Sequence, residues 1–184
     1  MGKVLYVVRH AKAEGQEPIA PLTVEGQIQA IQLMEQLQEF GIERLVSSPF
    51  LRTIQTIHPF ASEEGIDIEL DDRLAERMLS TINMDDWLKK LAQTFDDPDL
   101  RFQGGESSRE ALARISSVVQ DVLKGDETTL LVSHGNLISL FLQSLDGQFG
   151  FEEWKAMKNP HIFRIQFEDG KVTVSDFEAS IQFS

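Results

Sequence analysis

The sequence predicts an α/β fold in three layers, with helices on both faces of a mainly parallel β-sheet that has an antiparallel edge. Three observations support this prediction. Apolar runs rich in β-branched residues, at residues 3–10 and 129–133, are typical of parallel strands buried on both faces. Stretches with helical spacing of apolar residues alternate with such runs. Near its end the chain carries two strand-like segments joined by Asp169-Gly170, a favoured pair for a tight hairpin turn.

After the opening strand, the sequence predicts a loop and then a helix. Residues 11–21 are polar and hold Gly15 and two prolines, which is typical of a loop. Thr23 is a plausible N-cap for the helix that follows, and Gly41 ends that helix. The expected apolar face of this helix recurs every three residues and consists of Ile28, Ile31, Met34 and Leu37.

A second strand and a second helix are expected at residues 44–48 and at about residues 50–62. Ser48-Pro49 predicts an N-cap followed by proline at the first helical position, where the missing N–H of proline is not needed. Residues 66–70 alternate apolar and polar side chains, as a half-buried edge strand does.

Residues 72–105 form a long irregular stretch with a helix expected around residues 84–95, and insertions of this kind commonly form an active-site wall or lid. Ser107 to Glu110 is a capping box that opens a helix with an apolar period of 3.6 residues. The remaining elements are a strand at 129–133, helices at about 136–146 and 151–157, and a hairpin of 161–167 with 171–177. We expect one domain over 1–184 with a lid-like insertion at about 72–105.

The composition excludes several classes of protein. Hydrophobic residues make up 41% of the 184 residues, so a globular fold is expected. A net charge of −13 argues against nucleic acid or an anionic membrane surface as a partner, because both require a basic surface. The absence of cysteine excludes disulfides, thiolate nucleophiles and cysteine-bound zinc. No signal-peptide pattern and no membrane-spanning apolar run are found, so a cytoplasmic location is expected.

Charged and titratable side chains follow three predicted strands at their carboxyl ends, where open α/β sheets bind ligands. Arg9 and His10 end the first strand, His134 follows the strand at residues 129–133, and Arg52 lies in the first turn after another strand. Singly, each could be structural, since a strand-end histidine is more often a satisfied polar residue. Together, two guanidinium groups and two imidazoles predict a site for an anionic ligand such as a phosphate.

Five short motifs occur in a fixed order along residues 3–140. They are Arg9-His10-Ala11, Leu22-Thr-x-x-Gly26, Ser47-Ser-Pro-x-x-Arg52-Thr-x-x-Thr56, Gly105-Glu106-Ser107 and Ser133-His134-Gly135. In this order and spacing the chain resembles the histidine phosphatase superfamily, which includes phosphoglycerate mutase-like and phosphohistidine phosphatase-like proteins. The other two histidines, His58 and His161, lie outside these motifs and are expected to be structural.

The resemblance implies a phosphoglycerate mutase-like fold and a role for each matching residue. His10 would be the nucleophile that becomes a phosphohistidine, and Glu76 would be the proton donor. The residues that would bind the phosphoryl group are Arg9, Gln16, Arg52, His134 and Gly135. Glu106 and Ser107 match a motif that shapes the pocket in the mutase-like branch.

Two departures from the family pattern bear on these roles. Ala11 stands where most mutase-like members have glycine, and alanine is common there in the smaller phosphohistidine phosphatase branch. The glycine-tryptophan-glutamate-glycine segment that often follows the acid is missing after Glu76. Asp71 and Asp72 therefore remain alternatives for the proton donor, and Glu76 could instead be a surface carboxylate paired with a neighbouring arginine.

The sequence thus predicts a metal-independent phosphatase that hydrolyses phosphomonoesters, or phosphohistidine, through a phosphohistidine intermediate. Its alternatives are phosphoglycerate mutase-type transfer and a non-catalytic phospho-ligand binding module. No cofactor is expected, and the expected partner is a small phosphorylated substrate or a phosphoprotein. The substrate and the oligomeric state stay open. The apolar side chains of the insertion, namely Trp87, Leu88, Phe95 and Phe102, fit either a partly apolar leaving group or core packing.

Overall fold

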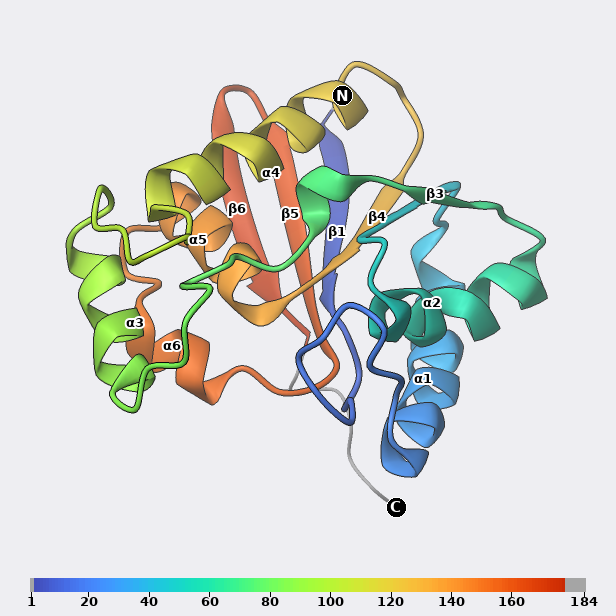
Figure 1. The fold of residues 1–184 in the computed structure, drawn as a ribbon. Helices are drawn as coiled ribbons and strands as arrows, with labels where there is room; N and C mark the ends of the chain where they lie inside the picture. The colour runs from blue at the N-terminus through green and yellow to red at the C-terminus, as the bar shows by residue number, and fades with distance from the viewer. Residues whose placement is uncertain (1, 178–184) are drawn as a thin grey trace.

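A six-stranded sheet lies at the centre of the computed structural model, which describes residues 2–177. The strand order is β3-β2-β4-β1-β5-β6, as Figure 1 shows in part. The strands are β1 (Lys3–Arg9), β2 (Arg44–Ser47), β3 (Ile68–Leu70), β4 (Thr129–Ser133), β5 (His161–Glu168) and β6 (Lys171–Asp176). The pairs among β1 to β4 are parallel, whereas β5 runs antiparallel to both β1 and β6. This confirms the expected mainly parallel sheet with an antiparallel edge.

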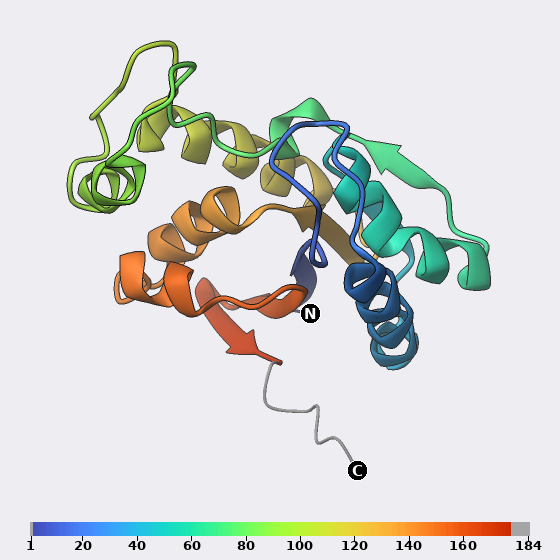
Figure 2. The same ribbon diagram turned by 60° about the horizontal axis from the view of Figure 1, so that its bottom comes forward.

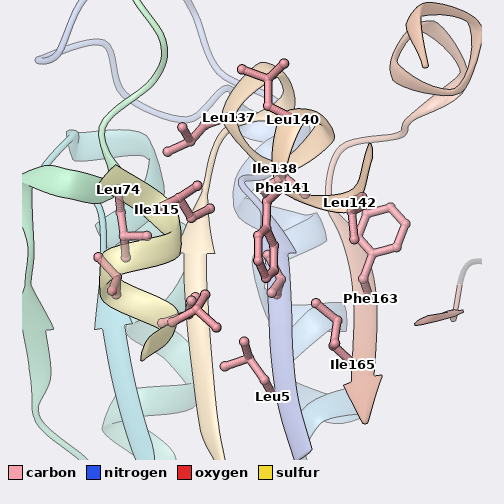
Figure 3. Close-up of a cluster of buried hydrophobic side chains, with 14 of the residues drawn as sticks. Leu5, Leu74, Ile115, Leu137, Ile138, Leu140, Phe141, Leu142, Phe163 and Ile165 are labelled. Atoms are coloured by element: carbon pink, nitrogen blue, oxygen red, sulfur yellow. The ribbon is translucent and has the colours of Figure 1, made fainter. Parts of the chain in front are cut away.

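Helices cover both faces of the sheet, so the three expected layers are confirmed (Figures 1 and 2). One face packs against α1 (Val24–Leu37) and α2 (Leu51–Glu64), and the other against α4 (Ser108–Val122) and α5 (Gly135–Leu145). Side chains alternate along β1, because successive residues of a strand point to opposite faces. Leu5 and Val7 therefore join the core under α4 and α5, and Figure 3 shows Leu5 in this core. Tyr6 and Val8 join the core under α1 and α2.

The segment between β3 and α4 contains a 3₁₀ turn, Asp72–Leu74, and one helix, α3 (Trp87–Asp96). In Figures 1 and 2, α3 lies beside α6 (Phe151–Ala156), away from the centre of the sheet. An aromatic contact joins the two helices, since the ring centroids of Phe95 and Phe151 are 5.9 Å apart. Two segments far apart in the sequence therefore form one wall. No helix within residues 2–177 is long and apolar enough to cross a membrane.

The predicted apolar face of α1 is wrong in two places. Ile28 and Ile31 are 54% and 51% exposed. The buried side chains are instead Ala30, Leu33 and Leu37. A step of three residues turns a helix by only about 300°, so the three steps from residue 28 to residue 37 drift around the helix, whereas steps of alternately four and three residues stay on one face. The exposed isoleucines are thus a consequence of helix geometry.

The predicted start of α2 is also wrong. The helix begins at Leu51, and its N-cap, Phe50, makes no capping bond through its side chain. Ser48 does not cap the helix, because its hydroxyl lies 2.8 Å from His134 Nε2 and accepts only a bond from the Phe50 N–H (3.3 Å). The caps at Thr23 and Ser107 are confirmed, as the side chains accept from the N–H groups of Gly26 and Glu110.

Candidate active site

The predicted functional side chains gather at the carboxyl ends of β1 and β4. Arg9 is paired with Ser133 in the parallel register of these strands, so His10 and His134 leave the sheet side by side. Their ring centroids are 5.2 Å apart and the rings lie edge to face. Arg52 reaches this pair from the first turn of α2 and donates from Nε to His10 Nε2 (3.2 Å).

His10 is held as a neutral imidazole with a defined tautomer. Its Nδ1 lies 2.7 Å from the Ala11 carbonyl oxygen, an acceptor, so Nδ1 carries the proton. Nε2 is then the unprotonated nitrogen, and it faces the Arg52 guanidinium. Burial lowers the pKa of His10 from 6.5 to about 3; the hydrogen bond to the Ala11 carbonyl opposes this, and the charges of Arg52 and Arg9 add smaller decreases. His10 can therefore act as a nucleophile through Nε2 at neutral pH.

His134 is fully buried behind His10. Burial first, and then repulsion from the positive charge of Arg52, hold the pKa of His134 well below its usual value. Its Nε2 lies 2.8 Å from the Ser48 hydroxyl, whereas Nδ1 is buried and has no hydrogen-bond partner within residues 2–177. If the hydroxyl donates to Nε2, the neutral ring carries its proton on Nδ1, where it can donate to an anion.

The two arginines are anchored by backbone carbonyl groups. Arg52 donates from Nη1 to the carbonyls of Gln16 (3.1 Å) and Glu17 (2.9 Å). Arg9 donates from Nη1 to the Met157 carbonyl (2.6 Å), while its buried Nε has no partner in the described part of the chain. Burial lowers the pKa of both guanidinium groups, but arginine remains charged at neutral pH. The site thus holds two fixed cations with donor capacity left for a ligand.

Gly135 makes room for Arg9. A Cβ atom at this position would lie 2.9 Å from Arg9 Nε and 3.0 Å from Cζ, closer than side chains ordinarily pack. Gly26 has a similar role near His10, since a Cβ atom there would collide with the Lys12 carbonyl oxygen. The glycines of two predicted motifs therefore bring α5 and α1 close to the segment that carries Arg9 and His10.

Glu76 lies at the N-terminus of α5, where free N–H groups favour an anion. Its carboxylate accepts from the N–H groups of Arg77 (2.8 Å), Leu137 (3.0 Å) and Asn136 (3.2 Å). It also lines the cavity beside His10. The two alternative carboxylates lie elsewhere: Asp71 caps the 3₁₀ turn and pairs with Arg73, and Asp72 is exposed.

A cavity of about 560 Å³ opens next to His10. It is lined by Arg9, His10, Lys12, Ala13, Gln16, Glu76, Arg77, Leu79, Trp87, Leu91, Asn136, Trp154 and Asn159. Arg52 and His134 do not line it, and both are buried next to His10. In the described part of the chain, no group of three histidine or acidic side chains is placed to hold a metal ion.

The expected pocket residues Glu106 and Ser107 do not line the cavity. The Glu106 carboxylate pairs with Arg114 (2.7 Å), and Ser107 caps α4. Their effect on the cavity is indirect, because the Glu106 carbonyl accepts from Arg77 Nη2 (3.0 Å) and so fixes a lining residue.

Sequence reasoning missed several side chains of the site. Asn136 follows the Ser133-His134-Gly135 motif directly, and its buried Nδ2 has no partner within residues 2–177. Asn159 donates to the His10 carbonyl (2.8 Å) from the loop before β5. Asn136 could have been predicted because it directly follows this motif. No sequence pattern around Asn159 or the cavity residue Trp154 indicates a place in the site.

The other two histidines, His161 and His58, lie outside the site. His161 Nε2 lies 2.8 Å from Asp176 Oδ1, and His161 Nδ1 accepts from the Lys158 N–H (3.1 Å). These bonds fix the loop whose Met157 carbonyl holds Arg9. His58 is exposed on α2.

The sequence and the fold of this chain are similar to those of known proteins. The family model described as histidine phosphatase superfamily (branch 1) matches residues 5–180. A probable phosphoglycerate mutase GpmB from Enterobacter sp. (strain 638) is 30% identical over 186 residues, which span 90% of this chain and 85% of that protein. A GpmB protein from Salmonella newport (strain SL254) is 28% identical over 91% of this chain and 86% of its own length.

Solved structures share the fold at lower identity. A mycobacterial glucosyl-3-phosphoglycerate phosphatase aligns with a TM-score of 0.80 and 22% identity, over 98% of this chain and all of that one (100%). A mutant phosphoserine phosphatase from Entamoeba histolytica, in complex with phosphoserine, aligns with a TM-score of 0.78 and 20% identity, over 97% of this chain and 98% of that one. At these identities the likeness concerns the fold.

Proposed function

Because this chain belongs to the histidine phosphatase superfamily, we propose that it is a metal-independent phosphatase that hydrolyses phosphomonoesters through a phosphohistidine on His10. One observation carries the proposal. His10 is a buried, neutral imidazole whose Nε2 faces the Arg52 guanidinium at the edge of a cavity. A nucleophile beside fixed positive charge is the arrangement that phosphoryl transfer requires.

In the first half-reaction, Arg52 Nε gives up its hydrogen bond to His10 Nε2, and the freed lone pair of Nε2 attacks the phosphorus atom. The N–P bond forms while the bond from phosphorus to the leaving oxygen breaks, and protonated Glu76 gives its proton to that oxygen. Negative charge spreads over the three equatorial phosphoryl oxygens in the transition state. Arg9 and Arg52 stabilise this charge, and the free Nδ1 of His134 supplies a further donor.

In the second half-reaction, water attacks the phosphorus atom of the phosphohistidine. Glu76, now ionised, takes a proton from this water, the N–P bond breaks, and inorganic phosphate and neutral His10 are released. One carboxyl group thus serves as acid and then as base. The three N–H groups that donate to Glu76 hold its oxygens at the cavity wall for both steps.

Hydrolysis fits the cavity better than a mutase reaction, which needs a site for a second anionic group. The cations of the cavity outside the phosphoryl site are Lys12 and Arg77. Arg77 donates to Thr94 Oγ1 (2.8 Å) and to the Glu106 carbonyl, and Lys12 is paired with Glu25 (2.5 Å). Both cations therefore already have partners within the protein.

A labelling experiment tests the proposal. The protein is mixed with a phosphomonoester carrying labelled phosphate and quenched within one turnover. We expect a labelled protein that loses phosphate in acid and keeps it in base, as a phosphoramidate does. His10→Ala removes both the label and the activity, whereas the exposed His58→Ala keeps them. A label that is stable in acid would contradict histidine chemistry.

Two further assays separate the alternatives. With bisphosphoglycerate and 3-phosphoglycerate, a phosphatase releases free phosphate and a mutase accumulates the phosphoglycerate isomer. Full activity in excess chelator is expected. A protein that binds phosphate tightly but neither takes up label nor releases phosphate would be the non-catalytic binding module.

A further inference from the structure

The wall of the cavity away from His10 is apolar. It is formed by Leu79, Trp87 and Leu91 from the segment before α4, and by Trp154 from α6. Leu91 is buried. Trp87 lines the cavity and is 50% exposed, so its indole is not part of a hydrophobic core. Of the four apolar side chains that the sequence left open between these two roles, only Trp87 lines the cavity; Leu88, Phe95 and Phe102 do not.

The apolar wall is held in place by packing between α3 and α6. Trp154 stacks on Phe151 with ring centroids 5.5 Å apart, and Phe151 contacts Phe95 of α3. Thr94, next to Phe95, is anchored twice: its hydroxyl accepts from Arg77 Nη1 (2.8 Å), and its carbonyl accepts from the Ser108 hydroxyl (2.8 Å). A preformed apolar surface binds a ligand without a further ordering cost.

The charges around the wall disfavour a second anionic group on the substrate. The Arg77 guanidinium is buried, and its Nε, Nη1 and Nη2 all donate to protein acceptors. Lys12 lies in an ion pair with Glu25. Within residues 2–177, buried donors without a partner lie at Arg9 Nε and Asn136 Nδ2 on the cavity wall and at His134 Nδ1 next to the His10 ring. These donors can bind the phosphoryl group at His10.

We propose that this cavity selects phosphomonoesters of uncharged alcohols that carry an apolar, ring-sized group, and that Trp87 is the residue that sets the preference. The inference rests on the proposed function, because the phosphoryl group at His10 fixes where the alcohol lies. A cavity of about 560 Å³ is large enough for a phosphate with an aromatic ring attached.

A matched pair of substrates tests the preference. Both 2-phenylethyl phosphate and ethyl phosphate release a primary alcohol, so they differ in the apolar ring and little in the reactivity of the leaving group. Burial of a ring of this size predicts that kcat/KM is about 30-fold higher for the phenyl ester. Trp87→Ala should reduce this ratio to about threefold or less, since it removes much of the apolar wall. Leu88→Ala, on the same helix but outside the cavity, should keep the ratio.

Fluorescence gives a binding readout that does not depend on turnover. The chain has two tryptophans, Trp87 and Trp154, and both line the cavity. In the His10→Ala variant, 2-phenylethyl phosphate should shift the tryptophan emission at concentrations where ethyl phosphate and phosphoserine do not. Trp87→Ala in the same background should weaken binding of the phenyl ester by about tenfold.

The outcomes separate the specificity inference from the proposed function. A substrate ratio near one, with hydrolysis that His10→Ala still abolishes, overturns the inference and leaves the phosphatase in place. A clear preference for phosphoserine or 3-phosphoglycerate over 2-phenylethyl phosphate also overturns it, because those substrates carry a second charge. If neither ester is hydrolysed and no phosphoenzyme forms, the proposed function fails and the inference falls with it.

Discussion

Replacing Arg52 tests whether positive charge beside His10 drives the chemistry. Arg52 is buried and donates to His10 Nε2 (3.2 Å) and to the carbonyl of Glu17 (2.9 Å). An arginine at a phosphoryl-transfer transition state is worth about 10³–10⁵ in rate. We therefore expect Arg52→Ala to lower kcat/KM by about that factor, which corresponds to ~4–7 kcal/mol of transition-state stabilisation.

The same substitution also affects stability, and the two effects can be separated. Loss of the hydrogen bonds from the guanidinium to the loop carbonyls should cost about 1.5–3 kcal/mol of unfolding free energy. Denaturant unfolding measures this cost, and kinetics are then compared at a temperature where every variant is folded. Arg52→Lys keeps the charge but cannot donate to His10 and to the loop at once, so we expect it to recover only about tenfold in kcat/KM.

Arg101→Ala is the matched control, because Arg101 is an exposed arginine paired with Glu110 (3.1 Å). Its kcat/KM should stay within about twofold of the unchanged protein, as surface ion pairs contribute little. Turnover of a phosphomonoester and the rate of phosphoenzyme formation are measured for all four proteins. A loss of only two- or threefold in Arg52→Ala would show that Arg52 does not act on the phosphoryl group.

Three more perturbations address the rest of the site. Gly135→Ala places a methyl group 2.9 Å from Arg9 Nε, so binding of vanadate should weaken by at least about tenfold while circular dichroism is unchanged; equal affinity would refute the assigned role of Gly135. Glu76→Gln should lower kcat by about 10²–10⁴, and with a good leaving group such as p-nitrophenol the phosphoenzyme should accumulate, since its hydrolysis still needs the base. Turnover that stays high would remove Glu76 from the mechanism. The folded-state pKa of His10 is about 3, below the ordinary 6.5, so the unfolded chain binds the proton first and the unfolding free energy should fall as pH drops from about 6.5 toward 3. NMR of the imidazole nitrogens should show neutral His10 at pH 5, and a protonated ring there would contradict the assigned burial and charge.

The residues of the proposed phosphoryl site could be predicted to lie together because backbone direction places them. A parallel strand ends where its neighbours end, so Arg9, His10 and His134 had to lie at the same edge of the sheet once two strands were recognised. The first turn of α2 brought Arg52 to that edge, although the helix begins later than the sequence suggested. The sheet, its hairpin edge and the three layers followed from apolar patterning in the same way.

Other features could not be predicted, because they depend on contacts between distant segments. The Asn159 amide reaches the His10 carbonyl from a loop 149 residues away. Trp154 faces the cavity only because α6 packs against α3, and no local pattern encodes that contact. Ser48 looked like a helix cap, since a serine before a proline carries that signal, but the buried His134 competes for its hydroxyl.

The residues that the sequence could predict are those proposed to bind the phosphoryl group, and those that it could not predict include part of the apolar wall. The groups proposed to act on the phosphoryl group, apart from Glu76, belong to short motifs that follow β1, β2 and β4, and the sheet fixes where these motifs lie. Apart from Leu79, the apolar wall belongs to α3 and α6, and Arg77 joins α3 to that centre through its bond to Thr94. Substitutions in α3 can therefore change which alcohol is accepted while Arg9, His10 and His134 stay in place. Substrate choice in this chain should accordingly be read from Trp87 and its neighbours, and the chemistry from the ends of the strands.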